Sequence, residues 1–511
     1  MAAKVAGCCE GLVSSIDEVP TISEIMHKAI IDHTFPGGTV AFGSCTVPCY
    51  YQAYGTYTFE SSIGVTPESG WDMASLTKIM VTAPCVMVLY DRGLIALEQV
   101  ACKYLPEFGN NGKEIITVRQ LLTHTAGLHE FYPFFDMGLT KREEVLDYIM
   151  KDKLWYGAGM AHYSDLSMIV LGLIVERITG MPLDVFASNE IFEPLGMRHT
   201  SFRPVDTTDF NPMIVPTEVD QMHRNRLLWG EVHDSTAFVL GGVAGHAGLF
   251  STIMDVCRFA QMMLAGGMDQ ATNCRLFKET TVRLFTTPGL RTLTNPRPFA
   301  LGWDVAVRRS VDGYTSAGKY LGPRTFGHTG FTGTSLWIDP DRNLFVALLT
   351  NAVHPTAVGG CGSQVREVRP LIADAAVYTM GEQAIPRESL TWHLGFVYQG
   401  EEKRYLEALK EAHVVPTTDD DILASEASLL GLQSSAMSEN AQHAAGNVKS
   451  RTTLEVSIPL MSQQVAQVTF TSVTPSVVFG QNVSEGAPDK LVLWRRIVPI
   501  VVFAVVIGVV S

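Results

Sequence analysis

The chain has 511 residues, of which 46% are hydrophobic and 18% are charged, and its formal net charge is −14 at pH 7. A chain of this length and composition can bury a large core, which excludes a disordered polymer. The acidic balance, with no long Lys/Arg run in the body, excludes nucleic acid as the expected partner.

The amino-terminal segment, residues 1–19, lacks the charged start, apolar run and small-residue cleavage site of a secretory signal. A helix is predicted over 21–32, and alternating apolar residues predict a hairpin of strands 39–44 and 50–59. We therefore expect a globular domain that begins near residue 20 and is not exported by that route.

The most informative segment of the chain is Ser75-Leu76-Thr77-Lys78. Ser75 and Lys78 are three residues apart, so they share one face of a helix. A helix that begins near Ser75 places its positive end there, which helps the Lys78 amine to lose its proton. A neutral amine can take the serine's proton, so the pair predicts a nucleophile beside its base. A second match, Ser316 with Lys319, lies in a Gly-rich stretch with no helical run after it and is interpreted as chance.

Two tripeptides follow the first motif: Tyr163-Ser164-Asp165 and His328-Thr329-Gly330. In order and separation the three motifs resemble S-x-x-K, Y-x-N and K-T-G of the serine β-lactamase and penicillin-binding-protein family. The segments between them resemble the class C β-lactamase and esterase branch: 92–106, 116–128, 241–252 and 301–303. The resemblance covers most of the chain, residues 20–380.

The resemblance implies an α/β (α+β) fold in a hydrolase domain of residues 20–384. An antiparallel sheet would be flanked by the terminal helices, 21–32 and 364–380, with a mostly helical insertion over about 75–290. Alternating and apolar runs predict the remaining strands of this sheet: 299–307, 333–338 and 344–350. The catalytic site would lie between the sheet and the insertion.

The resemblance also assigns roles to single residues. Ser75 would form an acyl-enzyme, with Lys78 as the first candidate for its base. Tyr163 would pass a proton to the leaving group and later help to activate water. The backbone N–H groups of Ser75 and Phe331 would form the oxyanion hole. Four further residues would contact the substrate: Asp165, His328, Thr329 and Gly330.

Two residues depart from the family pattern. His328 replaces a lysine, so a permanent cation that would face a substrate carboxylate becomes a group that is mostly neutral near pH 7. Asp165 replaces an asparagine and loses two amide donors. Both changes weaken the recognition of anions, so an esterase, amidase or peptidase is favoured over a β-lactamase. Asp165 could instead pair with Lys78 and raise its pKa, which would favour Tyr163 as the base. The sequence leaves that choice open.

Other functions remain compatible with the sequence. Some animal relatives of the family assemble into filaments, so the body could be a non-catalytic scaffold that self-assembles or binds partners. A protein that is acylated by penicillin without turnover is a third possibility, which His328 disfavours. The expected substrate is a small-molecule or peptide ester or amide. We expect no metal and no cofactor, because no zinc-ligand spacing occurs; the oligomeric state is open.

The carboxy-terminal part differs in composition. Residues 385–490 are predicted to hold a linker and a small appended module with strands at 456–459 and 465–470. In the tail, 491–511, an almost wholly apolar run, 497–510, follows Arg495 and Arg496, so the tail is a possible membrane-spanning helix. The predicted location is therefore a membrane surface with the catalytic body in the cytosol. A core strand or buried helix is the alternative interpretation of this short run.

Overall fold

The computed structural model describes residues 21–46, 49–157, 159–204, 214–289, 299–306, 315–357 and 364–380, and the backbone of three carboxy-terminal strands. The chain divides into two compact units, Met1–Val397 and Tyr398–Ser511. The predicted domain boundary at residue 384 lies outside the described residues.

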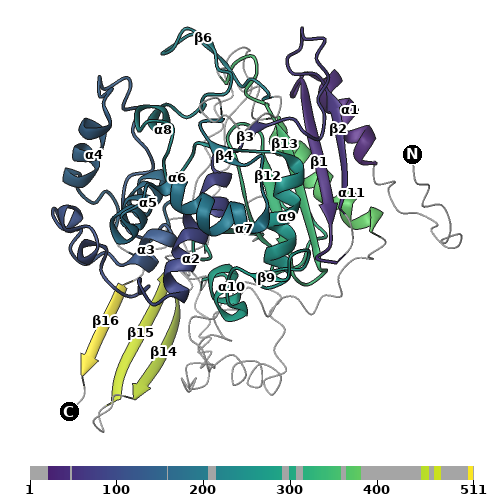
Figure 1. Cartoon of the computed structure of the whole chain (residues 1–511). Coiled ribbons are helices and arrows are strands. Elements are labelled where there is room, and N and C mark those ends of the chain that lie inside the picture. The colour runs from purple at the N-terminus through teal and green to yellow at the C-terminus, as the bar shows by residue number, and fades with distance from the viewer. Residues whose placement is uncertain are drawn as a thin grey trace, which may run out of the picture. The chain divides into compact units, whose positions relative to one another are not determined.

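The first unit is built on a six-stranded sheet with the order β10-β11-β12-β13-β1-β2 (Figure 1). All neighbouring strands are antiparallel. The strands are β1 (Gly37–Gly43), β2 (Tyr50–Gly55), β10 (Asp304–Val305), β11 (Phe326–Thr329), β12 (Ser335–Asp339) and β13 (Leu344–Thr350). Of the strand predicted over 299–307, only Asp304–Val305 is a strand among the described residues, and β11 was not predicted from the sequence.

Strand β13 shows why this sheet separates two cores. Leu344, Val346 and Leu348 belong to the core shared with helices α1 (Ile22–Ile31) and α11 (Val365–Thr379). The alternate residues Phe345, Ala347 and Leu349 belong to the second core, beneath α9 (Ile253–Leu264). Because successive side chains of a strand point to opposite faces, one seven-residue strand serves both cores. The expected fold, an antiparallel sheet flanked by terminal helices, is confirmed (Figure 1).

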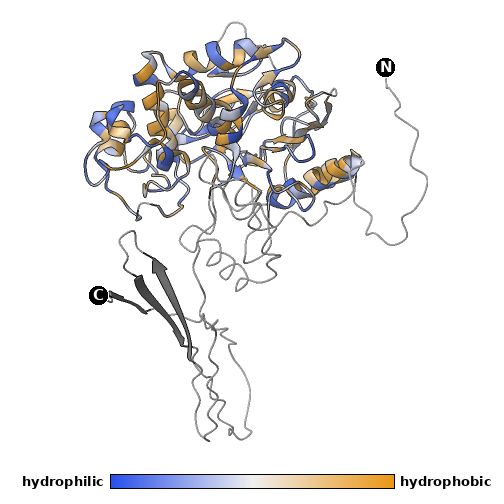
Figure 2. Ribbon diagram, turned by 90° about the horizontal axis from the view of Figure 1, so that it is seen from below, coloured by the Kyte–Doolittle hydropathy of each residue, from blue (hydrophilic) through white to orange (hydrophobic). Residues whose placement is uncertain are grey.

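The inserted part carries short helices and small paired strands. Its helical segments are η1 (Lys78–Thr82), α2 (Ala83–Asp91), η2 (Ala101–Lys103), η3 (Pro106–Phe108), α3 (Val118–Leu122), α4 (Arg142–Lys151), α5 (Asp165–Thr179), α6 (Leu183–Ala187), η4 (Ser188–Phe192), α7 (Glu193–Leu195), α8 (Ser235–Val239), α9 and α10 (Glu279–Thr286). Its short strands are β3 (Trp71–Asp72), β4 (Ser201–Phe202), β5 (Val219–Asp220), β6 (Arg226–Leu227), β7 (Leu249–Ser251), β8 (Met268–Asp269) and β9 (Cys274–Arg275). Hydrophobic and hydrophilic residues alternate around many of these helices (Figure 2), as expected for helices with one buried face.

The second unit has a three-stranded antiparallel sheet in the order β14-β15-β16. Strands β14 (Arg451–Pro459) and β15 (Val465–Val473) contain the predicted strands 456–459 and 465–470. The predicted tail helix is wrong for Ala504–Val509, which form β16 paired with β15. β-Branched valine and isoleucine suit a strand better than a helix. Within the described residues, no single helix is long and apolar enough to span a membrane, although the bent pair Asp165–Thr179 and Leu183–Leu195 meets the criteria of length and composition.

Candidate active site

Ser75 lies on a sharp turn between a strand and a helix. Strand β3 pairs with β7 and ends at Asp72, and the helical segment begins just after Ser75. Ala74 has a φ of 46°, a left-handed conformation that is uncommon for a residue with a Cβ. The Asp72 carboxylate holds this turn by accepting a hydrogen bond of 2.8 Å from the Ala74 N–H. Burial raises the pKa of Asp72 in spite of hydrogen bonds from Ala74 and His233.

Lys78 is fully buried and has three polar neighbours. Its Nζ lies 2.7 Å from Ser75 Oγ, 2.8 Å from Asp165 Oδ1 and 3.0 Å from the His246 carbonyl oxygen. Burial lowers the pKa of Lys78, but the charge of Asp165 and the contact with Tyr163 outweigh it and leave the pKa raised. The pairing that the sequence left open therefore forms, and Lys78 carries its proton at rest.

Tyr163 is the third group at the serine. Its hydroxyl donates to Ser75 Oγ at 3.2 Å, and Lys78 Nζ lies 5.1 Å from the centre of its ring. Burial, with a smaller contribution from Asp165, raises the pKa of Tyr163 to about 12 although Lys78 acts in the opposite direction. The phenol is therefore protonated at neutral pH and is suited to donate a proton to a leaving group.

Two local features position the segment that carries Tyr163 and Asp165. Ser164 is the N-cap of α5, and its side chain accepts a hydrogen bond from the Ser167 N–H. The ring of His124 packs on Tyr163 at 4.8 Å, and its Nδ1 accepts from the Ser164 N–H at 3.1 Å. The sequence suggested no role for His124, because its contact with residues 163 and 164 is made across the fold.

Strand β11 ends within the His328-Thr329-Gly330 segment. This segment places the next residue, Phe331, close to Ser75. Thr332 and Thr334 donate to the backbone oxygens of Asp72 and Met73, at 2.8 and 3.1 Å. A Cβ on Gly330 would lie 2.0 Å from Thr334 Oγ1, so only glycine fits there. The His328 ring is buried, lies 5.7 Å from the Tyr163 ring, and its Nδ1 is 2.6 Å from the Thr329 carbonyl oxygen.

The predicted oxyanion donors are the backbone N–H groups of Ser75 and Phe331. Neither donates a hydrogen bond to another residue within the described part of the chain. The Phe331 side chain is 66% exposed and its ring lies 5.6 Å from His233. Both N–H groups therefore keep their donor capacity for an incoming oxygen.

Several residues that hold this site were not found from the sequence. Arg369 of α11 donates to the carbonyl oxygens of Gly330 and Thr334, at 2.7 and 3.1 Å, and so supports the segment that carries Phe331. The second S-x-x-K match lies in a turn, where the Lys319 N–H donates to Asp374 of α11. No sequence signal marks such long-range partners.

Comparison with known proteins places the chain in a family. A family model described as Beta-lactamase matches residues 20–368. A protein of Salmonella agona (strain SL483) named "Putative D-alanyl-D-alanine carboxypeptidase" is 35% identical over 313 residues, 57% of this chain and 71% of that protein. A protein of the same name from Salmonella schwarzengrund (strain CVM19633) is 35% identical over 316 residues, with the same coverage.

Solved structures share the fold at low sequence identity. The octameric penicillin-binding protein homologue from Pyrococcus abyssi has a TM-score of 0.54 at 16% identity and covers 89% of this chain and 91% of its own. The hydrolase EstCE1, described as having promiscuous acyltransferase activity, has a TM-score of 0.53 at 19% identity and covers 68% of this chain and 97% of its own. These likenesses concern the fold alone.

Proposed function

Because the chain belongs to the β-lactamase family, we propose that it is a serine hydrolase that forms an acyl-enzyme on ester or amide bonds. The observation that carries this proposal is the meeting of two groups at one oxygen: Lys78 Nζ and Tyr163 OH lie 2.7 and 3.2 Å from Ser75 Oγ. A nucleophile within hydrogen-bond reach of a candidate base is the arrangement that covalent catalysis requires. A non-catalytic scaffold would need none of these contacts.

The pair with Asp165 disfavours Lys78 as the base, but the pKa of Tyr163 is itself raised to about 12 and its hydroxyl donates to Ser75, so Lys78 is retained as the base. The first chemical step then uses the deprotonated form of Lys78. Its lone pair takes the proton of the Ser75 hydroxyl while Oγ attacks the substrate carbonyl carbon. The carbonyl oxygen gains negative charge and accepts hydrogen bonds from the N–H groups of Ser75 and Phe331. The neutral Tyr163 phenol then gives its proton to the leaving group, and water later releases the acyl group by the reverse sequence of proton transfers.

The substrate side of the site favours an esterase or peptidase over a β-lactamase. His328 stands where the family has a lysine, and Asp165 adds a carboxylate that pairs with Lys78. A carboxylate-bearing substrate would therefore meet less positive charge than in relatives with lysine. The relatives named carboxypeptidases support a peptide substrate.

A substrate panel tests the proposal. We expect the purified protein to cleave short uncharged p-nitrophenyl esters or D-amino acid amides, and to cleave a chromogenic cephalosporin much more slowly. Ser75→Ala removes the nucleophile and is the matched control for each substrate. A cephalosporin rate comparable with the best ester rate would contradict the electrostatic argument, and equal rates in Ser75→Ala would contradict the assignment of the nucleophile.

We also propose that the apolar tail after Arg495 and Arg496 attaches the protein to a membrane, with the body in the cytosol. The support is composition: the run 497–510 is almost wholly apolar and follows two arginines, which favour the cytosolic side. Because Ala504–Val509 form a strand, the proposal concerns attachment and not a spanning helix.

A further inference from the structure

Asp234 and His246 form a side-chain pair close to Lys78 that the reaction scheme does not use. His246 is 2% exposed, and its Nε2 lies 2.9 Å from Asp234 Oδ1. Its Nδ1 has no hydrogen-bond partner in the described part of the chain. The same Asp234 oxygen accepts from the Ala237 N–H at 2.7 Å and caps α8. The imidazole is thus oriented by Asp234, which is itself fixed to the start of a helix.

The backbone of His246 reaches the catalytic lysine directly. Two of the groups beside Lys78 Nζ can only accept hydrogen bonds: the His246 carbonyl at 3.0 Å, and the Asp165 carboxylate, an ion-pair partner at 2.8 Å. The Ser75 hydroxyl, 2.7 Å away, can also donate, as can the neighbouring Tyr163 hydroxyl, which itself donates to Ser75 Oγ. A neutral Lys78 has two N–H bonds and one lone pair. If the two acceptors take both N–H bonds, the lone pair faces Ser75.

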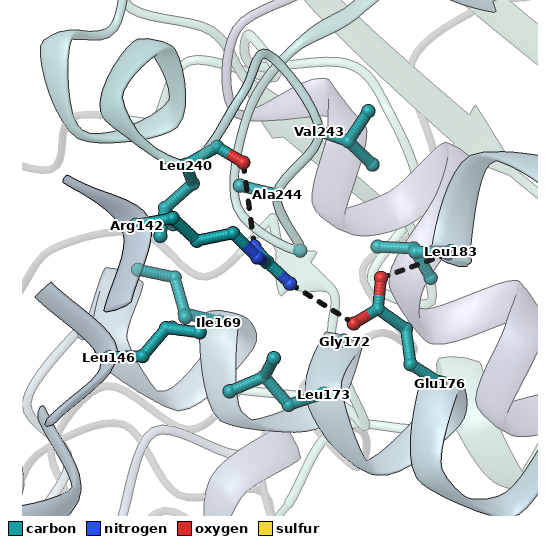
Figure 3. Close-up of a pocket in the computed structure, with 11 residues that line it drawn as sticks. Arg142, Leu146, Ile169, Gly172, Leu173, Glu176, Leu183, Leu240, Val243 and Ala244 are labelled. Atoms are coloured by element: carbon teal, nitrogen blue, oxygen red, sulfur yellow. Dashed lines mark hydrogen bonds and ion pairs between the residues drawn. The ribbon is translucent and has the colours of Figure 1, made fainter. Parts of the chain in front are cut away.

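The loop that carries this carbonyl is held at both ends. A Cβ on Gly245 would lie 2.0 Å from the Met168 carbonyl oxygen, and Thr82 Oγ1 donates to the Gly245 carbonyl at 2.6 Å. At the other end, Arg142 of α4 donates to the Leu240 carbonyl oxygen at 3.4 Å. Figure 3 shows this contact beside a cavity of about 10 Å³, which is room for about one water molecule.

We propose that Asp234 and His246 are positioning residues, which aim the lone pair of Lys78 at Ser75 by fixing the His246 carbonyl. This inference rests on the proposed function. In the step concerned, the Ser75 O–H bond breaks and its proton joins the Lys78 lone pair. The Oγ electron pair forms the bond to the carbonyl carbon, and the C=O π pair moves to oxygen. Asp234 and His246 neither gain nor lose a proton.

The charges around Asp234 and His246 keep the Asp234 carboxylate ionised, so it stays a hydrogen-bond acceptor. Burial acts to raise the pKa of Asp234, but the interaction with His246 and the bond from Ala237 outweigh it and hold the pKa well below its usual range. The other ionisable groups that face Asp234 are His233, whose Nε2 is 2.8 Å from Glu218, and the buried Asp72. Asp234 therefore remains an ionised acceptor throughout the neutral range.

The test measures the rate and the stoichiometry of Ser75 labelling by a fluorophosphonate probe, with ester kinetics alongside. Asp234→Ser keeps a side chain that caps α8 but cannot reach His246. We expect it to label to full stoichiometry at a rate lower by about tenfold or more, with kcat reduced and KM little changed, because only the proton transfer is misaligned. Asp234→Asn keeps an oxygen that accepts from Nε2 and is expected to restore most of the rate.

The matched control is Arg142→Gln, which loosens the same loop at Leu240. We expect it to stay within about twofold of wild type, as surface changes far from the reacting atoms usually do. An equal loss in Arg142→Gln, or no rate loss in Asp234→Ser, would overturn the inference. If Asp234→Ser does not fold, His246→Gln, which keeps a donor for Asp234, must outperform His246→Leu. A wild-type protein that is not labelled at Ser75 would instead contradict the proposed function.

Discussion

The two sides of the active site differ in exposure and in charge. On the nucleophile side, Lys78 is fully buried and contacts Ser75, Asp165 and the His246 carbonyl at 2.7–3.0 Å. On the β11 side, the Phe331 side chain is 66% exposed, and a histidine stands at position 328 in the segment that resembles K-T-G. In the proposed function, the first side transfers protons and the second contacts the substrate.

This difference indicates that the residues for proton transfer and the residues for substrate recognition can change independently within one fold. Proton transfer to and from Ser75 depends on the precise placement of the groups that carry the proton, so the loss of Lys78 or Tyr163 is expected to slow the reaction strongly. Recognition by charge depends on the sign and permanence of one side chain, so replacing a lysine by His328 redirects it without touching the nucleophile. The following predictions test this separation.

The largest effect is expected on the nucleophile side. Lys78→Ala removes the base and Tyr163→Phe removes the proton donor, so each variant is expected to lose on the order of a hundredfold or more in kcat. Lys319→Ala, in the second S-x-x-K match, is the control and is expected to retain wild-type turnover. Near wild-type turnover in Lys78→Ala or Tyr163→Phe would remove that residue from its role.

A smaller effect is expected from His328→Lys on the β11 side. The added cation is expected to shift the ratio of cephalosporin to ester kcat/KM upward by about tenfold, the scale of one charge-assisted hydrogen bond. Ester turnover is the internal reference, because the substituted side chain does not act on Ser75. An unchanged ratio would show that position 328 does not set anion recognition.

Asp165 contacts Lys78, and replacing it is expected to increase the rate, in contrast to the losses expected at Lys78 and Tyr163. Its charge raises the pKa of Lys78, so the deprotonated lysine is scarce at neutral pH and the wild-type acylation rate is expected to rise with pH through this range. Asp165→Asn lowers that pKa, which moves the rising limb to lower pH and increases the rate at about pH 7 by several-fold. A fall in rate at every pH would mean that Asp165 itself accepts the proton.

The smallest effect on catalysis is expected from deleting all residues after Lys490. Ester turnover is expected to match the full chain, because the site groups all lie in the first unit. Membrane association in cell fractions is expected to be lost, as the tail supplies the apolar residues. Unchanged attachment in the truncated chain would contradict the proposed role of the tail.

Local sequence signals predicted the parts of the site that are local in structure. Ser75 and Lys78 meet because their spacing matches a helical turn, and the helix predicted over 364–380 is α11 (Val365–Thr379). The strand predicted over 344–350 is β13 with the same bounds, because a continuous apolar run suits a strand buried on both faces.

The remaining features depend on contacts between distant residues. The bonds of Asp72 to His233 and of Asp234 to His246 have no periodic or spacing signal. The predicted strand 299–307 is mostly irregular in its described part, where Gly302 adopts a φ of 88° that a regular strand does not use. The extent of its hydrogen bonding is set by the neighbouring strand β11, which the sequence did not reveal.

The central claim is that Ser75 is the nucleophile of an acyl-transfer reaction, and covalent labelling tests it most directly. The full chain is treated with an activated phosphonate, and its intact mass and peptide map are recorded. The account predicts one adduct per chain, located on Ser75 and absent from Ser75→Ala. Equal labelling of Ser75→Ala, or no adduct on the folded wild-type protein, would contradict it.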